Sequence, residues 1–188
     1  MKITVLKNLF YFLLTVGLSS TSLAMFPQES FAGGQPRELI AAETSGELTE
    51  AKIREVMSVI EKAEKEEDIN TLLKTLAPFA VSEVTVEVEE QGITRTVEGI
   101  EAHRQLLEQT FALIEKREPI NQFMSIRFTA DNQVVIVTRI VLEALTTTEG
   151  KSFYASGTDI FRFAWLDGRP RIISTKSQGW IEERPSGL

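Results

Sequence analysis

Apolar side chains recur three and four residues apart in three segments of the chain, which is the spacing of one buried helix face. The first predicted helix covers residues 49–65, with Thr49 as its N-terminal cap. A shorter helix follows over residues 68–76 and ends before Pro78. The third predicted helix covers residues 100–116. The apolar stripe of the first helix consists of Ile53, Val56, Met57 and Ile60, and that of the third consists of Ile100, Leu107, Phe111 and Ile114.

Alternation of apolar and polar residues predicts strands in the rest of the chain. In residues 81–89, Val84, Val86 and Val88 alternate with glutamate or threonine, and a turn at Gln91-Gly92 leads back along residues 93–97 as a hairpin. Four more strands are predicted near residues 122–129, 133–147, 152–165 and 171–180, separated by turns at Asp131-Asn132, Glu149-Gly150 and Asp167-Gly168. This order of elements predicts an α+β fold with helices packed on one face of a curved sheet.

Residues 1–24 have the pattern of a secretory signal peptide. Lys2 and Lys7 precede a short apolar stretch at residues 9–18, and Ser22 and Ala24 provide the small residues of a cleavage site before Met25. The alternative is a membrane anchor, but a membrane-spanning helix needs roughly 20 apolar residues. We therefore expect a secreted or periplasmic protein whose mature form has no membrane span.

The remaining chain is expected to form one domain with short extensions. Residues 25–47 are interrupted by proline and glycine and predict a flexible tether, residues 48–181 predict the folded domain, and residues 182–188 predict a C-terminal tail. The 188 residues include no cysteine, and the single histidine is His103, so disulfides, thiolate sites and multi-histidine metal centres are excluded within the chain. The net charge of −7 argues against a nucleic-acid partner. We expect no metal and no cofactor.

The order of elements and three local motifs resemble the nuclear-transport-factor-2-like superfamily and its SnoaL-like group. The motifs are the short helix capped by Asp68, the glycine of Val97-Glu-Gly-Ile before the third helix, and Thr158-Asp-Ile-Phe-Arg-Phe followed by the Asp167-Gly168 turn. The resemblance covers nearly all of residues 48–181. It implies a cone-shaped barrel, in which a curved, mainly antiparallel sheet wraps around the long N-terminal helix and leaves a cavity at the wide end. Phe79 departs from the pattern, because many relatives carry an aspartate there.

Asp159 is the sharpest candidate for chemistry. Strand alternation places it on the same face as Phe161, Phe163 and Trp165. Burial among aromatic rings would raise the pKa of its carboxyl group and suit it to acid–base work. The alternative is a structural carboxylate that neighbouring hydroxyl or N–H groups satisfy. Together with Phe111, these four residues are predicted to line a ligand site.

Four further polar residues are candidates for a role in chemistry. His103 would act as a proton shuttle if it entered the cone, or it would be a partly exposed residue with one hydrogen bond. Tyr154 lies on the strand face opposite to Asp159, so an acid–tyrosine dyad is not expected. Arg139 and Glu143 share a strand face and are expected to pair with neighbouring strands on the outer surface, with Arg139 as an anion anchor in the cavity as the alternative.

The sequence contains no phosphate-binding loop, nucleophile elbow or dinucleotide-binding fingerprint. We therefore expect an exported, non-catalytic domain that binds a small, largely apolar ligand in a cone-shaped cavity. One alternative is a small cofactor-independent isomerase, dehydratase or cyclase that uses Asp159 with His103. Another is a structural dimer whose cone is filled by side chains, since this superfamily hosts both enzymes and binding proteins.

Residues 134–145 are apolar in both alternating sets, which predicts a strand that is covered on both faces. One set contains Ile136, Ile140, Leu142 and Ala144, and the other contains Val135, Val137, Val141 and Leu145. We expect the second set on the outer face of the sheet, where a second copy of the chain would cover it in a homodimer. The alternative cover is the N-terminal segment, folded back over the sheet.

The mature chain is expected to begin near Met25, because signal peptidase cleaves after small residues at the −3 and −1 positions. N-terminal sequencing of the protein from the secreted or periplasmic fraction checks this prediction. An intact Met1 on protein recovered from the cytoplasm would contradict both the cleavage site and the export.

Overall fold

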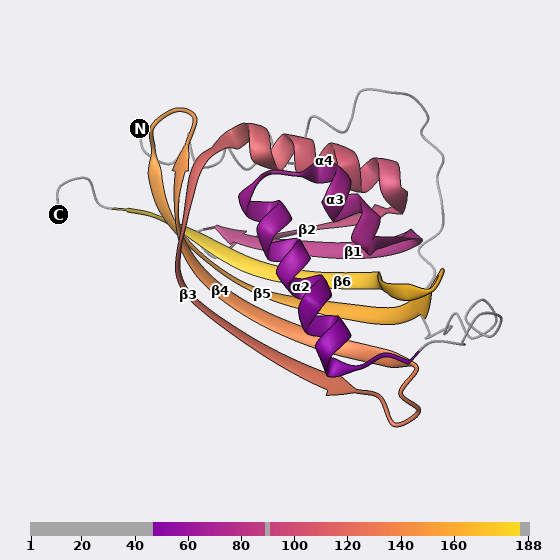
Figure 1. Ribbon diagram of the computed structural model, residues 1–188. Helices are drawn as coiled ribbons and strands as arrows, with labels where there is room; N and C mark the ends of the chain where they lie inside the picture. The colour runs from indigo at the N-terminus through magenta and orange to yellow at the C-terminus, as the bar shows by residue number, and fades with distance from the viewer. Residues whose placement is uncertain (1–46, 89–90, 185–188) are drawn as a thin grey trace.

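The computed structural model describes residues 47–88 and 91–184 of the chain (Figure 1). The helices and strands in these residues are, in chain order, α2 (Glu50–Lys65), α3 (Ile69–Thr75), β1 (Leu76–Val88), β2 (Gln91–Glu98), α4 (Gly99–Leu113), β3 (Ile114–Phe128), β4 (Val134–Thr147), β5 (Ser152–Leu166) and β6 (Arg169–Glu183). The predicted signal peptide and nearly all of the predicted tether lie outside the described residues. Glu182 and Glu183, predicted as the start of the tail, belong to β6.

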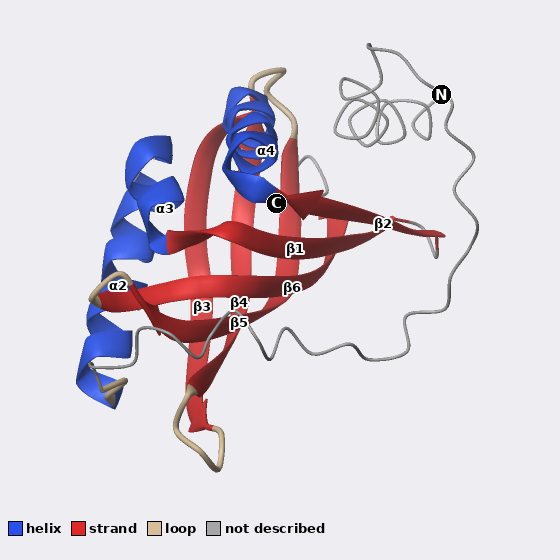
Figure 2. Cartoon of the chain, turned by 90° about the vertical axis from the view of Figure 1, so that its right-hand side faces the viewer, coloured by secondary structure: helices blue, strands red, loops and turns tan. Residues whose placement is uncertain are grey.

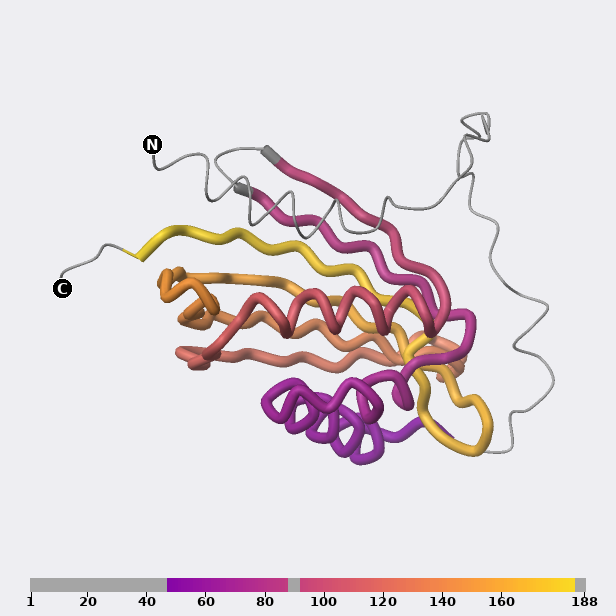
Figure 3. The backbone as a smooth tube through the Cα atoms, turned by 90° about the horizontal axis from the view of Figure 1, so that it is seen from above, coloured from indigo at the N-terminus to yellow at the C-terminus, as the bar shows by residue number. Residues whose placement is uncertain are grey.

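The six strands form one sheet in the order β2-β1-β6-β5-β4-β3. Neighbouring strands are antiparallel except β1 and β6, which are parallel. The sheet is curved, and the three described helices lie on its concave side (Figures 1 and 2), with α4 running along the strands (Figure 3). The predicted α+β fold, with helices on one face of a mainly antiparallel sheet, is confirmed. The sheet remains open, because β2 and β3 are its two edges.

Helices α2 and α3 begin at the residues that the sequence predicts. Thr49 Oγ1 accepts the backbone N–H of Lys52 at 3.3 Å, and Asp68 Oδ1 accepts the backbone N–H of Thr71 at 3.0 Å. Each bond satisfies one of the N–H groups that the first turn of a helix leaves without an intrahelical partner. Both caps therefore follow from local sequence alone.

The third predicted helix is too long at its C-terminal end. Helix α4 stops at Leu113, and Ile114, predicted as part of the apolar helix stripe, is the first residue of β3. Strand β3 therefore begins well before the predicted residue 122. It contains Pro119, which an edge strand tolerates because only one side of the strand is hydrogen-bonded. Glu115 and Lys116, the first charged residues of this edge strand, were included in the predicted helix.

The hairpin turn predicted at Gln91-Gly92 is also misplaced. Gln91 pairs with Val88 and Gly92 pairs with Glu87, so both belong to β2 and the chain reverses before Gln91. The other three turns lie where the sequence predicts them. Their backbone has the positive φ angles that asparagine, aspartate and glycine tolerate, at Asn132, Gly150, Asp167 and Gly168.

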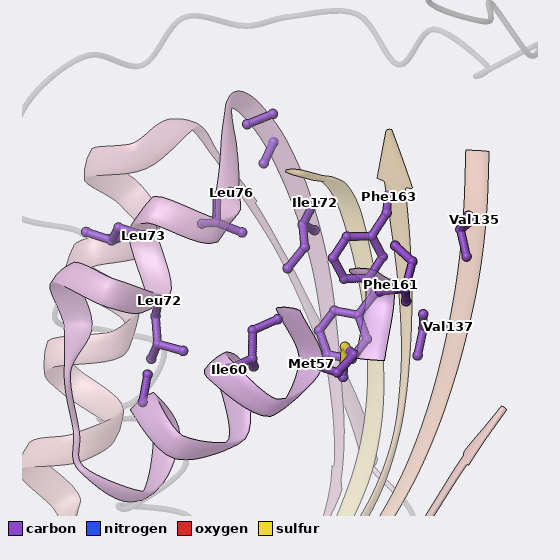
Figure 4. Packing of buried hydrophobic residues seen from close by; sticks show 14 of the residues in the cluster. Met57, Ile60, Leu72, Leu73, Leu76, Val135, Val137, Phe161, Phe163 and Ile172 are labelled. Carbon is purple, nitrogen blue, oxygen red and sulfur yellow. The ribbon is translucent and has the colours of Figure 1, made fainter. Parts of the chain in front are cut away.

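The apolar core lies between α2 and the concave face of the sheet. Met57 and Ile60 of α2 face Phe161 and Phe163 of β5, with Val135 and Val137 on the neighbouring strand (Figure 4). Val135, Val137 and Phe163 have an exposed fraction of 0%. The set that contains Val137 therefore lies on the inner face, and its predicted position on the outer face is wrong. Because both sets of β4 are apolar, alternation alone did not distinguish the face that meets the helix.

The convex face of the sheet carries exposed apolar side chains. Phe123 of β3 pairs with Ile140 of β4, and the two are 62% and 44% exposed. Trp180 of β6 is also exposed. No described helix packs on this face (Figure 1). Among the described residues, no helix is long and apolar enough to cross a membrane.

Candidate functional site

The concave face changes from apolar to charged along the strands. Val137 and Phe161 are cross-strand partners under α2. Two residues along β4, Arg139 pairs with Asp159 of β5, and Asp159 pairs with Ser177 of β6. Strand side chains alternate between faces, so these three residues lie on the same face as the core. A polar row therefore borders the apolar core.

Arg139 is the centre of this polar row. Its two terminal nitrogens donate to both carboxylate oxygens of Glu64 on α2, at 2.7 and 2.9 Å. Its Nε and Nη2 donate to Asp159 Oδ2 at 3.1 and 2.9 Å. The Arg139 side chain is only 9% exposed. Burial acts to lower the pKa of Arg139, but the bonds and charges of Glu64 and Asp159 outweigh it and raise the pKa above its ordinary value. The guanidinium is therefore permanently charged.

Asp159 lies on the concave face, as predicted, but its oxygens are engaged. Ser177 Oγ donates to Oδ1 at 2.7 Å, and Arg139 donates twice to Oδ2. A general base needs a free oxygen within reach of a substrate proton. This arrangement corresponds to the structural alternative for Asp159, because an ion pair and a hydroxyl already satisfy the carboxylate.

The aromatic residues predicted to line a ligand site have different surroundings. Phe161 and Phe163 are buried against α2 in the core, at 7% and 0% exposure. Trp165 lies at the same end of the sheet, with the Nζ of Lys52 4.5 Å from its ring centroid. Phe111 of α4 is partly buried, and Arg117 of β3 lies 6.0 Å from its ring centroid. Two members of the aromatic set lie beside the charged residues: Phe111 near Arg117, and Phe161, whose ring centroid is 5.3 Å from the guanidinium carbon of Arg139.

His103 is held in the packing between α4 and β1. Its Nδ1–H donates to the carbonyl oxygen of Gly99 at 2.6 Å, and its Nε2 lies 2.7 Å from the Oγ of Ser82. Thr175 in turn donates to Ser82 at 2.6 Å. With His103 and Ser82 each 5% exposed, this chain of bonds is closed to solvent, and no bond joins it to Asp159 among the described residues. The structure does not bring His103 and Asp159 together as an acid–base pair.

Glu143, like Arg139, was expected on the outer surface of the sheet. It lies on the concave face of β4, four residues along the strand from Arg139, and is not on the outer surface. Arg117 Nη1 donates to one of its oxygens at 3.2 Å, and the side chains of Arg117 and Glu143 are 30% and 22% exposed. Burial raises the pKa of Glu143, and the negative charges of Glu64 and Asp159 add to the effect, while Arg117 and Arg139 oppose it. The expected outer position of Arg139 and Glu143 is therefore wrong, although each does pair with a neighbouring strand.

Two glycines leave the middle of the concave face without side chains. Gly157 of β5 and Gly179 of β6 are cross-strand partners, and each lies two residues along its strand from the pair Asp159 and Ser177. A Cβ built on Gly157 would meet only one atom within 4 Å, the backbone oxygen of Gln178. No side chain of α2 or α4 therefore occupies the position next to Gly157. This glycine pair lies between the Arg139 network and the partners Glu143 and Ala155.

The described residues do not form a metal centre. No group of three histidine, aspartate or glutamate side chains is arranged to hold an ion in the described part of the chain. The carboxylates of the concave face are paired with arginines instead. The arrangement can hold a polar group of a ligand near Glu143 and an apolar body over the glycines.

No family model matches the chain, and no curated protein sequence matches it. Solved structures do match its fold. A ketosteroid isomerase-like protein from Erwinia carotovora atroseptica has a TM-score of 0.55 at 12% identity, over 69% of this chain and 94% of that one. Hexachlorocyclohexane dehydrochlorinase LinA-type3 from Novosphingobium barchaimii has a TM-score of 0.57 at 15% identity, over 73% and 90%. The chain thus has the nuclear-transport-factor-2-like fold that its motifs resemble.

The raised pKa of Glu143 predicts a pH-dependent stability. Between the ordinary value of 4.5 and the raised pKa, the folded protein binds more protons than the unfolded chain, so the free energy of unfolding falls as the pH rises through this window. Glu143→Gln removes this loss and keeps an acceptor for Arg117. We expect the variant to gain stability over the wild type at pH 7 but not at pH 4, as measured by urea unfolding.

Glu55→Gln is the matched control, because Glu55 is an exposed residue of α2. It makes the same change of charge, and we expect no such pH-dependent gain. Equal effects of the two substitutions, or a Glu143→Gln variant that is less stable at pH 7 than at pH 4 relative to the wild type, would contradict the assignment.

Proposed function

We propose that the domain binds a small, largely apolar molecule on the concave face of its sheet, between α4 and the strands that carry Gly157 and Glu143. Binding without chemistry is the function that the arrangement supports best. The observation that carries the proposal is the unoccupied position next to Gly157. On the sheet it is bordered by the small apolar side chains of Val141 and Ala155 and by the partly exposed carboxylate of Glu143.

The chemistry of the border supports an apolar ligand with one polar group. Ligand sites are lined mainly by apolar side chains, with a few polar groups that fix orientation. Val141 is the cross-strand partner of Gly157 on the concave face, Ala155 is the next residue of β5 on that face, and both are partly exposed. Glu143 has one oxygen bonded to Arg117, and its second oxygen can meet a hydroxyl or amine of the ligand.

The proposal extends to export. Residues 1–24 have the charge and apolar pattern of a signal peptide. The chain has no cysteine that an oxidising compartment would oxidise. We place the binding activity in the periplasm or outside the cell. There the domain would hold its ligand without any cofactor.

Chemical-shift mapping with 1-naphthol, a neutral bicyclic probe, tests the site. We expect the probe to shift the amide signals of β4 and β5 around Val141 and Gly157. Gly157→Leu fills the unoccupied position and should weaken binding by about tenfold or more, since a leucine side chain would occupy the space of the ligand.

Thr158→Leu is the matched control, because Thr158 is the neighbouring residue of β5 and points to the convex face. It should leave the affinity for the probe within about twofold of the wild type. Probe-induced shifts confined to the convex face, or unchanged binding by the Gly157→Leu variant, would reject the concave site.

A second candidate function is a small cofactor-independent isomerase, dehydratase or cyclase. The observation that favours it is Glu143, a partly exposed carboxyl group whose pKa burial raises toward the range useful for proton transfer. In this reading Glu143 replaces the pair of Asp159 and His103 that the sequence predicted. Turnover that is lost in Glu143→Gln while probe binding persists would favour the enzyme over the binding domain.

A further inference from the structure

The charged side chains around Glu143 do not balance. In the described part of the chain, two guanidinium groups and two further carboxylates act on Glu143, and they belong to Arg117, Arg139, Glu64 and Asp159. Arg139 is bonded to Glu64 and Asp159. Arg117 is bonded to Glu143. Three carboxylates therefore meet two guanidinium groups, and the cluster has a net charge of −1 when all five groups are ionised.

Other basic side chains of the described residues lie farther away or in water. Arg95 also lies on the concave face, because it pairs with Val84, the β1 partner of Ser177. Its strand β2 is four strands from β4, which is about 19 Å along the sheet at about 4.8 Å per strand. Lys62 and Lys65 of α2 are exposed, and water and salt screen exposed charges. The excess negative charge therefore remains beside Glu143.

The position of the cluster makes this excess charge costly. The side chains of Arg139, Asp159 and Glu143 are only 9%, 21% and 22% exposed. Charges that are withdrawn from water interact more strongly, and an unbalanced one is unfavourable. Burial raises the pKa of Glu143, so a bound proton is one way to remove the excess. A bound cation is another way, and it keeps the carboxylate ionised.

Glu143 has an oxygen available for such a cation. Arg117 Nη1 donates to Oε1 at 3.2 Å, and the second oxygen has no hydrogen-bond partner among the described residues. The neighbouring surface of the sheet is apolar, because Ala155 is the β5 partner of Glu143 and Val141 is the partner of Gly157. A ligand on this surface can thus place an apolar body over Gly157 and an N–H donor at the carboxylate.

We propose that the ligand of the concave face is a monocationic amine with an apolar body, whose ammonium group binds the second carboxylate oxygen of Glu143. This inference rests on the proposed binding function and names the chemical class of its ligand. The ammonium group brings the net charge of the cluster from −1 to zero. A neutral ligand leaves the excess charge in place, and an anionic ligand increases it.

Three probes with the same apolar body test the charge of the ligand. They are 1-naphthylmethylamine, 1-naphthylmethanol and 1-naphthylacetate, which are cationic, neutral and anionic at pH 7. Chemical-shift titration of the wild-type chain measures the affinity of each probe from the amide signals of β4 and β5. We expect the amine to bind about tenfold or more tightly than the alcohol, and the acetate to bind most weakly.

Glu143→Gln tests the place at which the ammonium group binds. The substitution removes the excess negative charge, so the preference for the amine over the alcohol should fall to about twofold or less. Glu55→Gln is the matched control, because it makes the same change in net charge on an exposed residue of α2. It should keep the preference of the wild type.

The outcomes separate this inference from the proposed function. An alcohol that binds as tightly as the amine would overturn the cationic ligand but leave the binding site on the concave face. The absence of concave-face shifts with all three probes would reject the proposed function itself. A preference for the amine that persists in Glu143→Gln would overturn the assignment to Glu143. The three-probe comparison uses the wild-type chain, so it decides the charge of the ligand without any variant.

Discussion

The buried guanidinium of Arg139 holds together parts of the molecule that are far apart in sequence. It binds Glu64 on α2 and Asp159 on β5, while Ser177 on β6 completes the shell of Asp159. A buried charge is costly unless it is paired and hydrogen-bonded, so the positions of the helix and both strands are coupled. The bidentate bond to Glu64 fixes the last turn of α2 against the sheet. The apolar core under the rest of α2 lies directly beside this anchor.

The same network occupies the oxygens of Asp159 but not those of Glu143. Asp159 is engaged by Arg139 and Ser177, so its charge stabilises the fold and is not free for a substrate proton. Glu143 lies outside the network, with one bond to Arg117. Burial, with a smaller effect from the charges of Glu64 and Asp159, makes its ionised form less favourable and raises its pKa. The glycine pair between them leaves room on the concave face. The polar network therefore marks the boundary between the structural and the accessible half of this face.

The features that the sequence predicted correctly are those that depend on residues close together in the chain. The caps Thr49 and Asp68, the apolar stripe of α2 and three turns depend on neighbouring residues, and all of them were predicted correctly. The end of α4 was not, because residues 114–118 carry as many charges as a solvated helix end, and only the sheet edge explains them as a strand.

The site depended on long-range pairing, which a single sequence does not contain. Strand alternation placed Asp159 correctly on the inner face, but Arg139 was placed outside because both sets of β4 are apolar. Glu64 was not among the predicted site residues, since its partner Arg139 lies 75 residues away in the sequence. The alternation of side chains along β4 was the available signal. Once Val137 lies on the concave face, Arg139 and Glu143 must lie on that face as well.

A double-mutant cycle between Arg139 and Asp159 tests the central role of the guanidinium most directly. Urea unfolding at one fixed protein concentration would compare the wild type, Arg139→Met, Asp159→Asn and the double variant. We predict that Arg139→Met alone costs about 3 kcal/mol, because it leaves two carboxylates without their partner. The double variant should lose less than the sum of the single losses, by about 1–3 kcal/mol. Losses that add within about 0.5 kcal/mol would show that the two side chains act independently and would contradict the role of Arg139 as the shared anchor.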